Sequence, residues 1–237
     1  MNANTSNGRQ RTGVLKPLVQ VVILVAVLAA ILFISSGRLH WVMAWVFLGL
    51  YLAAIIIAFL IIAPTNPELM AERAEFKPRP GVKNWDTVIS TLFKLSFPVT
   101  LLISGLDVRF AWTKPLPLAV QILALVIGLL GYGLIAWAVA SNRFATVYVR
   151  IQEERGHTVA TAGPYRFVRH PFYVGVITLT LAMPLVLGSL WALISAAFGA
   201  LLMTVKTALE DRTLQEGLDG YREYAQRVRH RLLPGIW

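Results

Sequence analysis

The sequence contains several uncharged apolar stretches that are long enough to span a lipid bilayer. A membrane helix needs about 20 consecutive apolar residues, and such runs recur from the N-terminal region to residue 205. The composition agrees, because 57% of the residues are hydrophobic and 14% are charged, against about 25% charged in a typical soluble domain. We therefore predict an all-α, polytopic integral membrane protein.

About six membrane helices are predicted. We expect the first to be a retained helix rather than a signal peptide, because its apolar run is long and no small-residue cleavage site is evident. The last two are joined by only Gly188 and Ser189 and contain 16 and 17 residues, which is short for a hydrocarbon core of about 30 Å. They are predicted to form a tight hairpin. The six ranges are 18–34, 41–63, 85–106, 116–140, 172–187 and 189–205.

The basic residues predict an orientation. With the N-terminus inside, 18 of the 22 Lys and Arg residues fall in inside segments, whereas the outside loops hold Arg38, Arg109 and Lys114. This bias places both termini and both long loops in the cytoplasm. The net charge of +10 is therefore assigned to membrane orientation and contact with the lipid bilayer rather than to nucleic acid. A cytoplasmic helix is expected near the C-terminus.

We predict a single membrane domain over residues 1–237. Residues 1–114 would supply N-terminal helices of unassigned role, and residues 115–237 the core that carries the motifs. The chain has no cysteine, which excludes thiolate metal sites and a cysteine nucleophile. H-E-x-x-H, G-x-S-x-G and G-x-G-x-x-G are also absent, and the four dispersed histidines, His157 among them, suggest no metal site.

The residues that could carry chemistry gather on one membrane face. Gly163-Pro164 predicts a turn, and Pro171 suits the first turn of a helix. Arg169 and His170 would then lie just ahead of that helix, where free amides and the helix dipole favour a carboxylate or phosphate. The acidic pair Glu210-Asp211 follows the hairpin on the same side, so the two clusters could together hold a zwitterion.

Two segments carry a family resemblance. Gly163-Pro164-Tyr165, Arg169-His170-Pro171-Phe172-Tyr173-Val174-Gly175 and the tail from Glu210-Asp211 through Gly220-Tyr221-Arg222-Glu223-Tyr224 resemble the isoprenylcysteine carboxyl methyltransferase family and its bacterial relatives. Gly131-Tyr132-Gly133 and Asn142-Arg143-Phe144 are similar to the related phospholipid N-methyltransferases. The resemblance extends from about residue 125 to the C-terminus, and the first three helices show none.

The resemblance implies a membrane methyltransferase that uses S-adenosyl-L-methionine. Its pocket would open to the cytoplasm, and a lipophilic or small-molecule methyl acceptor would reach it from the bilayer. The cofactor-binding residues that it implies are Gly131, Gly133, Asn142, Tyr165, His170, Tyr173, Gly175, Glu210 and Asp211.

Arg169 and Glu210 are the expected catalytic residues. Arg169 would hold an anionic substrate group, because guanidinium pairs bidentately with carboxylate or phosphate. A carboxylate acceptor needs no base, whereas an amine or thiol would need Glu210 or His170 to remove a proton. The chain has Asp211 where the family usually has a second Glu, and Lys206 is the nearest cation before the pair.

Simpler interpretations stand beside these. The glycines of residues 128–133 could serve simply to let neighbouring helices pack closely. Glu210-Asp211 could lie on a solvated helix face, with Lys206 one turn earlier. Two other functions are also considered. One is an NADPH-dependent oxidoreductase similar to membrane sterol reductases, which carry a similar R-H-P-x-Y segment, and the other is a non-enzymatic transporter or scaffold.

Overall fold

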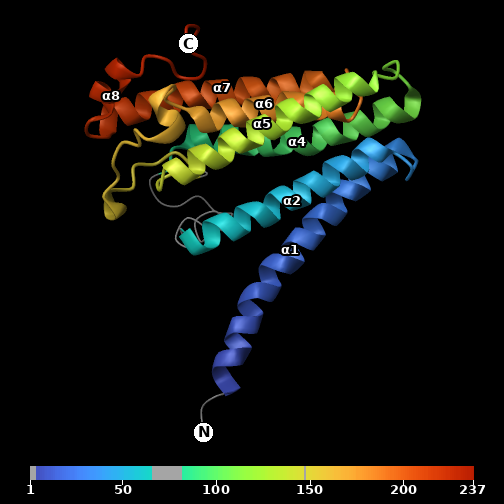
Figure 1. Cartoon of the computed structure of the whole chain (residues 1–237), viewed down its shortest axis with the longest axis horizontal. Coiled ribbons are helices and arrows are strands. Elements are labelled where there is room, and N and C mark those ends of the chain that lie inside the picture. The colour runs from blue at the N-terminus through green and yellow to red at the C-terminus, as the bar shows by residue number, and fades with distance from the viewer. Residues whose placement is uncertain (1–3, 66–81, 147) are drawn as a thin grey trace.

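The computed structural model describes residues 4–65, 82–146 and 148–237. Within these residues the secondary structure is helical, and long helices form a bundle with the short C-terminal helix at one end (Figure 1). The elements are α1 (Asn4–Ser36), α2 (Val42–Thr65), α4 (Asn84–Phe110), α5 (Leu118–Ser141), the 3₁₀ turns η1 (Glu153–Arg155) and η2 (Gly163–Arg166), α6 (Pro171–Val186), α7 (Ala192–Gly217) and α8 (Tyr221–Arg227).

The helix lengths confirm the predicted fold class. Five described helices, α1, α2, α4, α5 and α7, are long and apolar enough to cross a membrane. The sixth, α6, has 16 residues, or about 24 Å at 1.5 Å per residue, and is as short as expected. In contrast, α7 continues beyond residue 205 to Gly217, because polar side chains such as Lys206, Thr207 and Asp211 are buried there against the rest of the bundle.

The tight hairpin of α6 and α7 is confirmed and is fastened by Asp107 of α4. Gly188, in the connection, has a φ of +79°, which favours glycine. The Ser189 hydroxyl donates to Asp107 Oδ2 over 2.5 Å, and both the backbone N–H and the hydroxyl of Thr113 donate to the same carboxylate over 2.6 Å. Asp107 thus joins α4, the segment after it and the hairpin turn at one end of the bundle.

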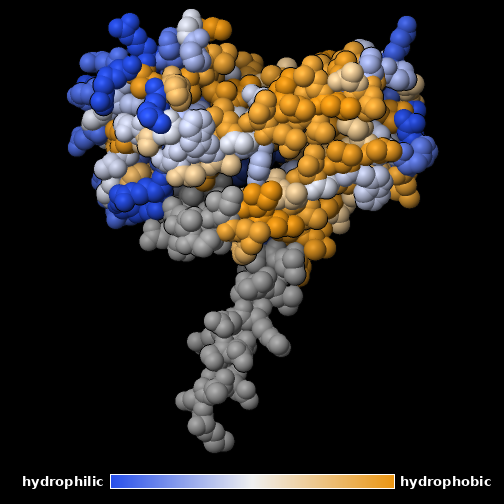
Figure 2. Space-filling view, viewed as in Figure 1, coloured by the Kyte–Doolittle hydropathy of each residue, from blue (hydrophilic) through white to orange (hydrophobic). Residues whose placement is uncertain are grey.

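Apolar side chains cover much of the outer surface. Figure 2 shows this apolar surface between two polar ends of the bundle. Large side chains such as Val22, Leu130, Ile194 and Leu201 are each more than half exposed. Exposing such a large apolar surface to water would be unfavourable, whereas the acyl chains of a lipid bilayer are themselves apolar and can cover it. The chain is therefore a multi-pass integral membrane protein.

The way the helices pack brings several chain segments together at one end of the bundle. α6 packs against both α5 and α7, while α4 packs against α7 and α1. The start of α6 and the ends of α5 and α7 then meet at the end that carries α8 (Figure 1). We call this the pocket end. Since α4 packs on α7, the packing of the bundle extends across the expected division at residues 114 and 115.

Candidate active site

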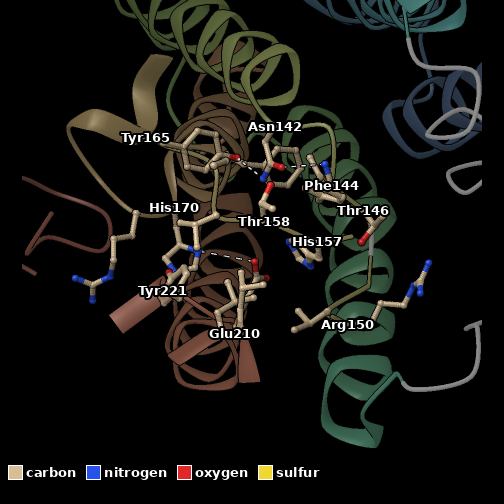
Figure 3. A pocket seen from close by; sticks show the side chains of 18 of the residues that line it. Asn142, Phe144, Thr146, Arg150, His157, Thr158, Tyr165, His170, Glu210 and Tyr221 are labelled. Atoms are coloured by element: carbon tan, nitrogen blue, oxygen red, sulfur yellow. Dashed lines mark hydrogen bonds and ion pairs between the residues drawn. The ribbon is translucent and has the colours of Figure 1, made fainter. Parts of the chain in front are cut away.

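A polar cavity opens at the pocket end (Figure 3). It encloses about 790 Å³ of empty space, counting its open mouth. Its walls come from the segment between α5 and α6, the start of α6, the last turns of α7, and α8. The lining residues include Asn142, Phe144, Thr146, Tyr148, Arg150, His157, Thr158, Tyr165, Arg169, His170, Phe172, Tyr173, Glu210, Leu214, Leu218, Tyr221 and Tyr224.

Local hydrogen bonds shape the wall that follows α5. The side-chain oxygen of Asn142 accepts the Phe144 N–H over 2.9 Å, and its amide donates to the Tyr165 hydroxyl over 3.3 Å. Gln152, which is fully buried, donates to the Phe144 carbonyl over 2.9 Å. Tyr224 of α8 closes the arrangement by donating to the Tyr165 carbonyl over 2.7 Å. Asn142 and Tyr165 therefore lie together at the cavity, as the resemblance implies.

Glu210 borders the cavity with an accessible carboxylate. Its side chain is 22% exposed, and Tyr173 of α6 donates to its Oε2 over 2.5 Å. Oε1 lies 3.9 Å from His170 Nδ1, and Figure 3 shows this contact facing the cavity. The structure thus brings three predicted site residues together: His170, Tyr173 and Glu210.

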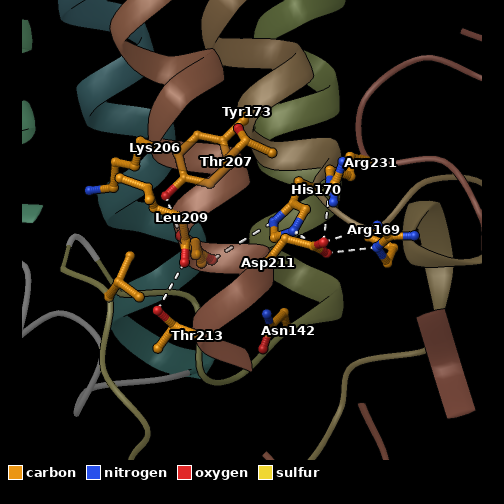
Figure 4. A network of polar contacts seen from close by, with 12 residues as sticks. Asn142, Arg169, His170, Tyr173, Lys206, Thr207, Leu209, Asp211, Thr213 and Arg231 are labelled. Atoms are coloured by element: carbon orange, nitrogen blue, oxygen red, sulfur yellow. Dashed lines mark hydrogen bonds and ion pairs between the residues drawn. The ribbon is translucent and has the colours of Figure 1, made fainter. Parts of the chain in front are cut away.

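Asp211 is fully buried behind the cavity (Figure 4). Arg169 contacts both carboxylate oxygens, with Nε at 2.7 Å and NH2 at 3.0 Å. His170 Nε2 lies 3.2 Å from Oδ1, and the Tyr221 hydroxyl donates to Oδ1 over 3.0 Å. Arg231 and Gln215 donate to Oδ2 over 2.8 Å each. We call this set the Asp211 clasp: Arg169, His170, Asp211, Gln215, Tyr221 and Arg231.

The clasp changes the role expected of Arg169. Besides Asp211, its NH1 donates to the carbonyls of Val228 and Arg229 over 2.8 Å each, so four of the five guanidinium N–H groups have partners within the chain. The anion expected ahead of α6 is therefore Asp211 itself. This geometry does not support the expectation that Arg169 holds an anionic substrate group, since its guanidinium joins α7 to the C-terminal segment.

A second buried ion pair fixes the cavity from the side of α4. Lys206 Nζ lies 2.7 Å from Asp86 Oδ1, and both side chains are almost completely buried. Asp86 Oδ2 also accepts the Val149 N–H over 2.7 Å, which ties the cavity wall to α4. Lys206 is thus paired across the bundle with Asp86, and the alternative of a solvated face that includes Lys206 and Asp211 does not apply.

The three predicted glycines do not line the cavity. Gly131 and Gly175 lie where α5 crosses α6, and a Cβ added at Gly175 would stand 2.6 Å from the Gly131 carbonyl oxygen. Gly133 is exposed, and a Cβ there would meet nothing within 4 Å. The alternative role in helix packing accounts for Gly131, and Gly175 packs against it at the same crossing.

His157 lines the cavity, although the sequence pattern indicated no role for it beyond excluding a metal site. Its ring lies 4.4 Å from that of Phe144, and its Nδ1 accepts the Gln152 N–H over 3.3 Å. Burial, together with the positive charges of Arg150 and Arg155, lowers the pKa of His157 to about 4. The ring is therefore neutral at pH 7 and carries its proton on Nε2, as a donor in the cavity wall (Figure 3). Only its place in the polar segment before Gly163 could have indicated this role.

The fold is that of a helical membrane protein with a polar cavity at one end of its bundle. Residues 118–216, from the start of α5 to the end of α7, match the family model of the Isoprenylcysteine carboxyl methyltransferase (ICMT) family. This segment, which contains most of the cavity, is similar to that family, and the predicted resemblance is confirmed over these residues.

The chain is also similar to a protein whose name refers to metal resistance. Over 177 residues the chain is 27% identical to the cobalt-zinc-cadmium resistance protein CzcN of Cupriavidus metallidurans, a match that covers 70% of each protein. Among the described residues, no group of three or more His, Cys, Asp or Glu side chains is arranged to hold a metal ion.

Proposed function

We propose that this protein is an S-adenosyl-L-methionine-dependent methyltransferase that acts on a lipophilic acceptor at the cytoplasmic membrane face. One observation carries the proposal: Asn142, Tyr165, His170, Tyr173 and Glu210, which the resemblance implies in cofactor binding, line a single cavity. The ICMT family match supports the reaction class and favours it over an NADPH-dependent reductase or a scaffold.

The chemistry of the cavity suits the cofactor. Phe144, Tyr148 and Tyr224 offer ring surfaces for an adenine base, and the Glu210 carboxylate has the charge opposite to a sulfonium. When bound, the cofactor would supply an electrophilic methyl group.

The side chains of the cavity would align the reactants and exclude water. Alignment of two reactants can supply about 7–11 kcal/mol of a barrier, so small displacements of these side chains would be costly. Tyr173 fixes the orientation of Glu210, His170 links Glu210 to the Asp211 clasp, and Tyr224 holds the wall at Tyr165. In this proposal Arg169 and Asp211 are positioning residues.

A separate apolar cavity supports a lipophilic acceptor. It encloses about 1190 Å³ of space that includes open surroundings, and its lining residues come from α2, α4, α5 and α6. Val176 lines this cavity and Phe172 lines the polar one, and four residues of a helix cover about 6 Å. An acceptor with its polar head near Glu210 could therefore extend an apolar tail along α6.

The positive-inside bias supports a cytoplasmic pocket end. The described segments of that end include the Arg-rich connection between α5 and α6 and the tail after α7. At the opposite end, Arg109 lies in the last turn of α4, and Arg38 and Lys114 lie in the connections between helices. Cytoplasmic placement would also give the pocket access to the soluble cofactor.

Calorimetric titration of the purified protein with S-adenosylhomocysteine tests the proposal. We expect saturable binding. A parallel titration with S-adenosyl-L-methionine, which carries the sulfonium that S-adenosylhomocysteine lacks, should show that Glu210→Ala weakens binding by about tenfold or more, since a charge-assisted contact is worth about 1.5–3 kcal/mol. Glu216→Ala is the matched control, because this carboxylate lies on the same helix, pairs with Arg212 and does not line the cavity. Absence of binding by folded protein would refute the proposed function.

A further inference from the structure

Lys94 is a cation within the apolar, membrane-spanning helix α4. It is the eleventh residue of this helix, so its backbone lies about 15 Å along the helix from its start. The side chains of Leu92 and Leu95, which flank it in the sequence, are exposed on the apolar surface of the bundle. Ionisable residues are rare at such a depth and in most cases mark a functional site, so the contacts of Lys94 are informative.

The polar contact of Lys94 is with Tyr148, in the connection between α5 and α6. Lys94 Nζ donates to the Tyr148 hydroxyl oxygen over 3.1 Å and lies 5.0 Å from the centre of that ring. No carboxylate in the described part of the chain pairs with Lys94. Lys206 differs in both respects, because it is buried and its Nζ lies 2.7 Å from Asp86 Oδ1, whereas Lys94 is exposed. The positive charge of Lys94 is therefore accessible at the surface.

Lys94 and Tyr148 together present hydrogen-bond donors that lack acceptors. An ammonium group has three N–H donors and no acceptor, and a phenol has one O–H donor. The contact with Tyr148 uses one N–H of Lys94 and the phenol oxygen. The phenol proton itself has no acceptor among the residues that the structure describes. Two N–H groups, one O–H group and a positive charge thus lie side by side, which suits the oxygens of a phosphate.

We propose that Lys94 and Tyr148 form a binding site for the phosphate of an anionic phospholipid in the leaflet at the pocket end. This inference goes beyond the proposed function and does not depend on it. A lipid is favoured over a soluble anion, because the exposed Leu92 and Leu95 beside Lys94 would contact its acyl chains. A net negative lipid is favoured over a zwitterionic one, because the charge of Lys94 is not balanced by a described carboxylate.

A lysine that merely extends toward the membrane surface is the simpler interpretation. Such snorkelling accounts for the direction of the Lys94 side chain toward the connection that contains Tyr148. It does not account for a phenol whose proton lacks an acceptor in the described residues. The two interpretations predict different results, because a snorkelling lysine attracts headgroups in general, whereas a site binds a single lipid in preference to others.

Native mass spectrometry of the purified full chain in detergent tests this inference. The protein is titrated with dioleoyl-phosphatidylglycerol, dioleoyl-phosphatidylcholine and dioleoylglycerol, which share their acyl chains and differ in the headgroup. We expect a single phosphatidylglycerol to bind about fivefold or more tightly than either other lipid, as one lysine near an anionic lipid would give. Lys94→Gln should remove this preference and Lys94→Arg should retain it. Tyr148→Phe should reduce it in part, because the ammonium group remains.

Lys83→Gln is the matched control, because Lys83 is an exposed cation just before the start of the same helix. An equal loss of preference in Lys83→Gln and Lys94→Gln would overturn the site, since it would reflect general attraction to headgroups. Unchanged binding by Lys94→Gln, which leaves a snorkelling lysine only, or by Tyr148→Phe would also overturn it. Displacement of the lipid by inorganic phosphate at similar affinity would overturn the assignment to a lipid. An unchanged unfolding temperature of Lys94→Gln would show that its weaker binding is not a loss of fold.

Discussion

Glu210 and Asp211 are neighbours in sequence, yet they belong to two different regions of the molecule. Glu210 borders the polar cavity with a 22% exposed side chain, whereas Asp211 is fully buried in the clasp with two arginines, a histidine, a tyrosine and a glutamine. Consecutive residues of an α-helix point about 100° apart. An acidic pair on a helix therefore divides into one residue for the ligand and one for the framework.

The comparison also separates two kinds of charge. In the clasp, opposite charges are satisfied by one another, so the ligand gains little from them. At the cavity, Glu210 retains a charge that a ligand can use. Substitutions at the two positions should therefore differ in kind: loss of folding stability for Asp211 and loss of turnover for Glu210.

The largest effect is expected from Asp211→Ala. Removal of this carboxylate leaves Arg169 buried at 6% exposure with two backbone partners only, and breaking a buried pair costs about 3–5 kcal/mol. We expect a marked drop in the free energy of unfolding, measured by thermal denaturation in detergent, with loss of ligand binding as a consequence. Asp219→Ala, at an exposed position just after α7, should have little effect. Equal stability of the two variants would show that the clasp does not hold the C-terminal segment.

Glu210→Gln should give the opposite pattern. The amide can still accept the Tyr173 hydroxyl, so the unfolding free energy should change by less than about 1 kcal/mol. Methyl transfer should fall by about 100-fold, as expected for loss of a general base. Steady-state kinetics with a labelled cofactor measures the second effect and thermal denaturation the first. A variant that loses stability in proportion to its activity would remove the distinction between the two regions.

The glycines of α5 and α6 extend the same geometric argument. Gly175→Ala should destabilise the protein by about 1–3 kcal/mol, because the new Cβ would stand 2.6 Å from the Gly131 carbonyl oxygen. Gly133→Ala has open space and should be neutral or stabilising by up to about 1 kcal/mol. Thermal denaturation tests both. If Gly133→Ala instead weakens S-adenosylhomocysteine binding while stability is unchanged, the role in cofactor approach that the resemblance implies is supported.

The sequence predicted the membrane helices well and the partners of polar residues poorly. Apolar runs and the hairpin at Gly188 are local signals, so the helices follow from the sequence directly. Pairings such as Asp86 with Lys206 join residues far apart in sequence and leave no periodic trace. The resemblance identified Asn142, Tyr165, His170, Tyr173 and Glu210, which line the cavity. The resemblance did not distinguish Glu210, which faces the cavity, from Asp211, which is buried behind it. It also did not indicate that His157 lines the cavity.

A smaller effect is expected at His157, the neutral donor of the cavity. His157→Phe should weaken ligand binding about tenfold, since one hydrogen bond contributes about 0.5–1.5 kcal/mol. His157→Gln places an amide donor near the position of Nε2 and should restore much of the binding, whereas His157→Asn can only replace the contact of Nδ1 with Gln152. Calorimetry with S-adenosylhomocysteine, and kinetics with the acceptor once it is identified, measure these differences. Equal affinities for both ligands in all three variants would mean that His157 only packs against Phe144.

A pH dependence of stability is also expected to originate in the cavity wall. The pKa of His157 is lowered from 6.5 to about 4 in the fold, so between these values the unfolded chain binds more protons than the folded one. Stability from this group is complete above about pH 6.5 and is lost as the pH falls through this window. Thermal denaturation at pH 7, 5.5 and 4.5 should show a steeper decline for the wild type than for His157→Gln, which cannot titrate. Parallel declines would assign the acid sensitivity to other groups and would leave the neutral donor in the cavity without this support.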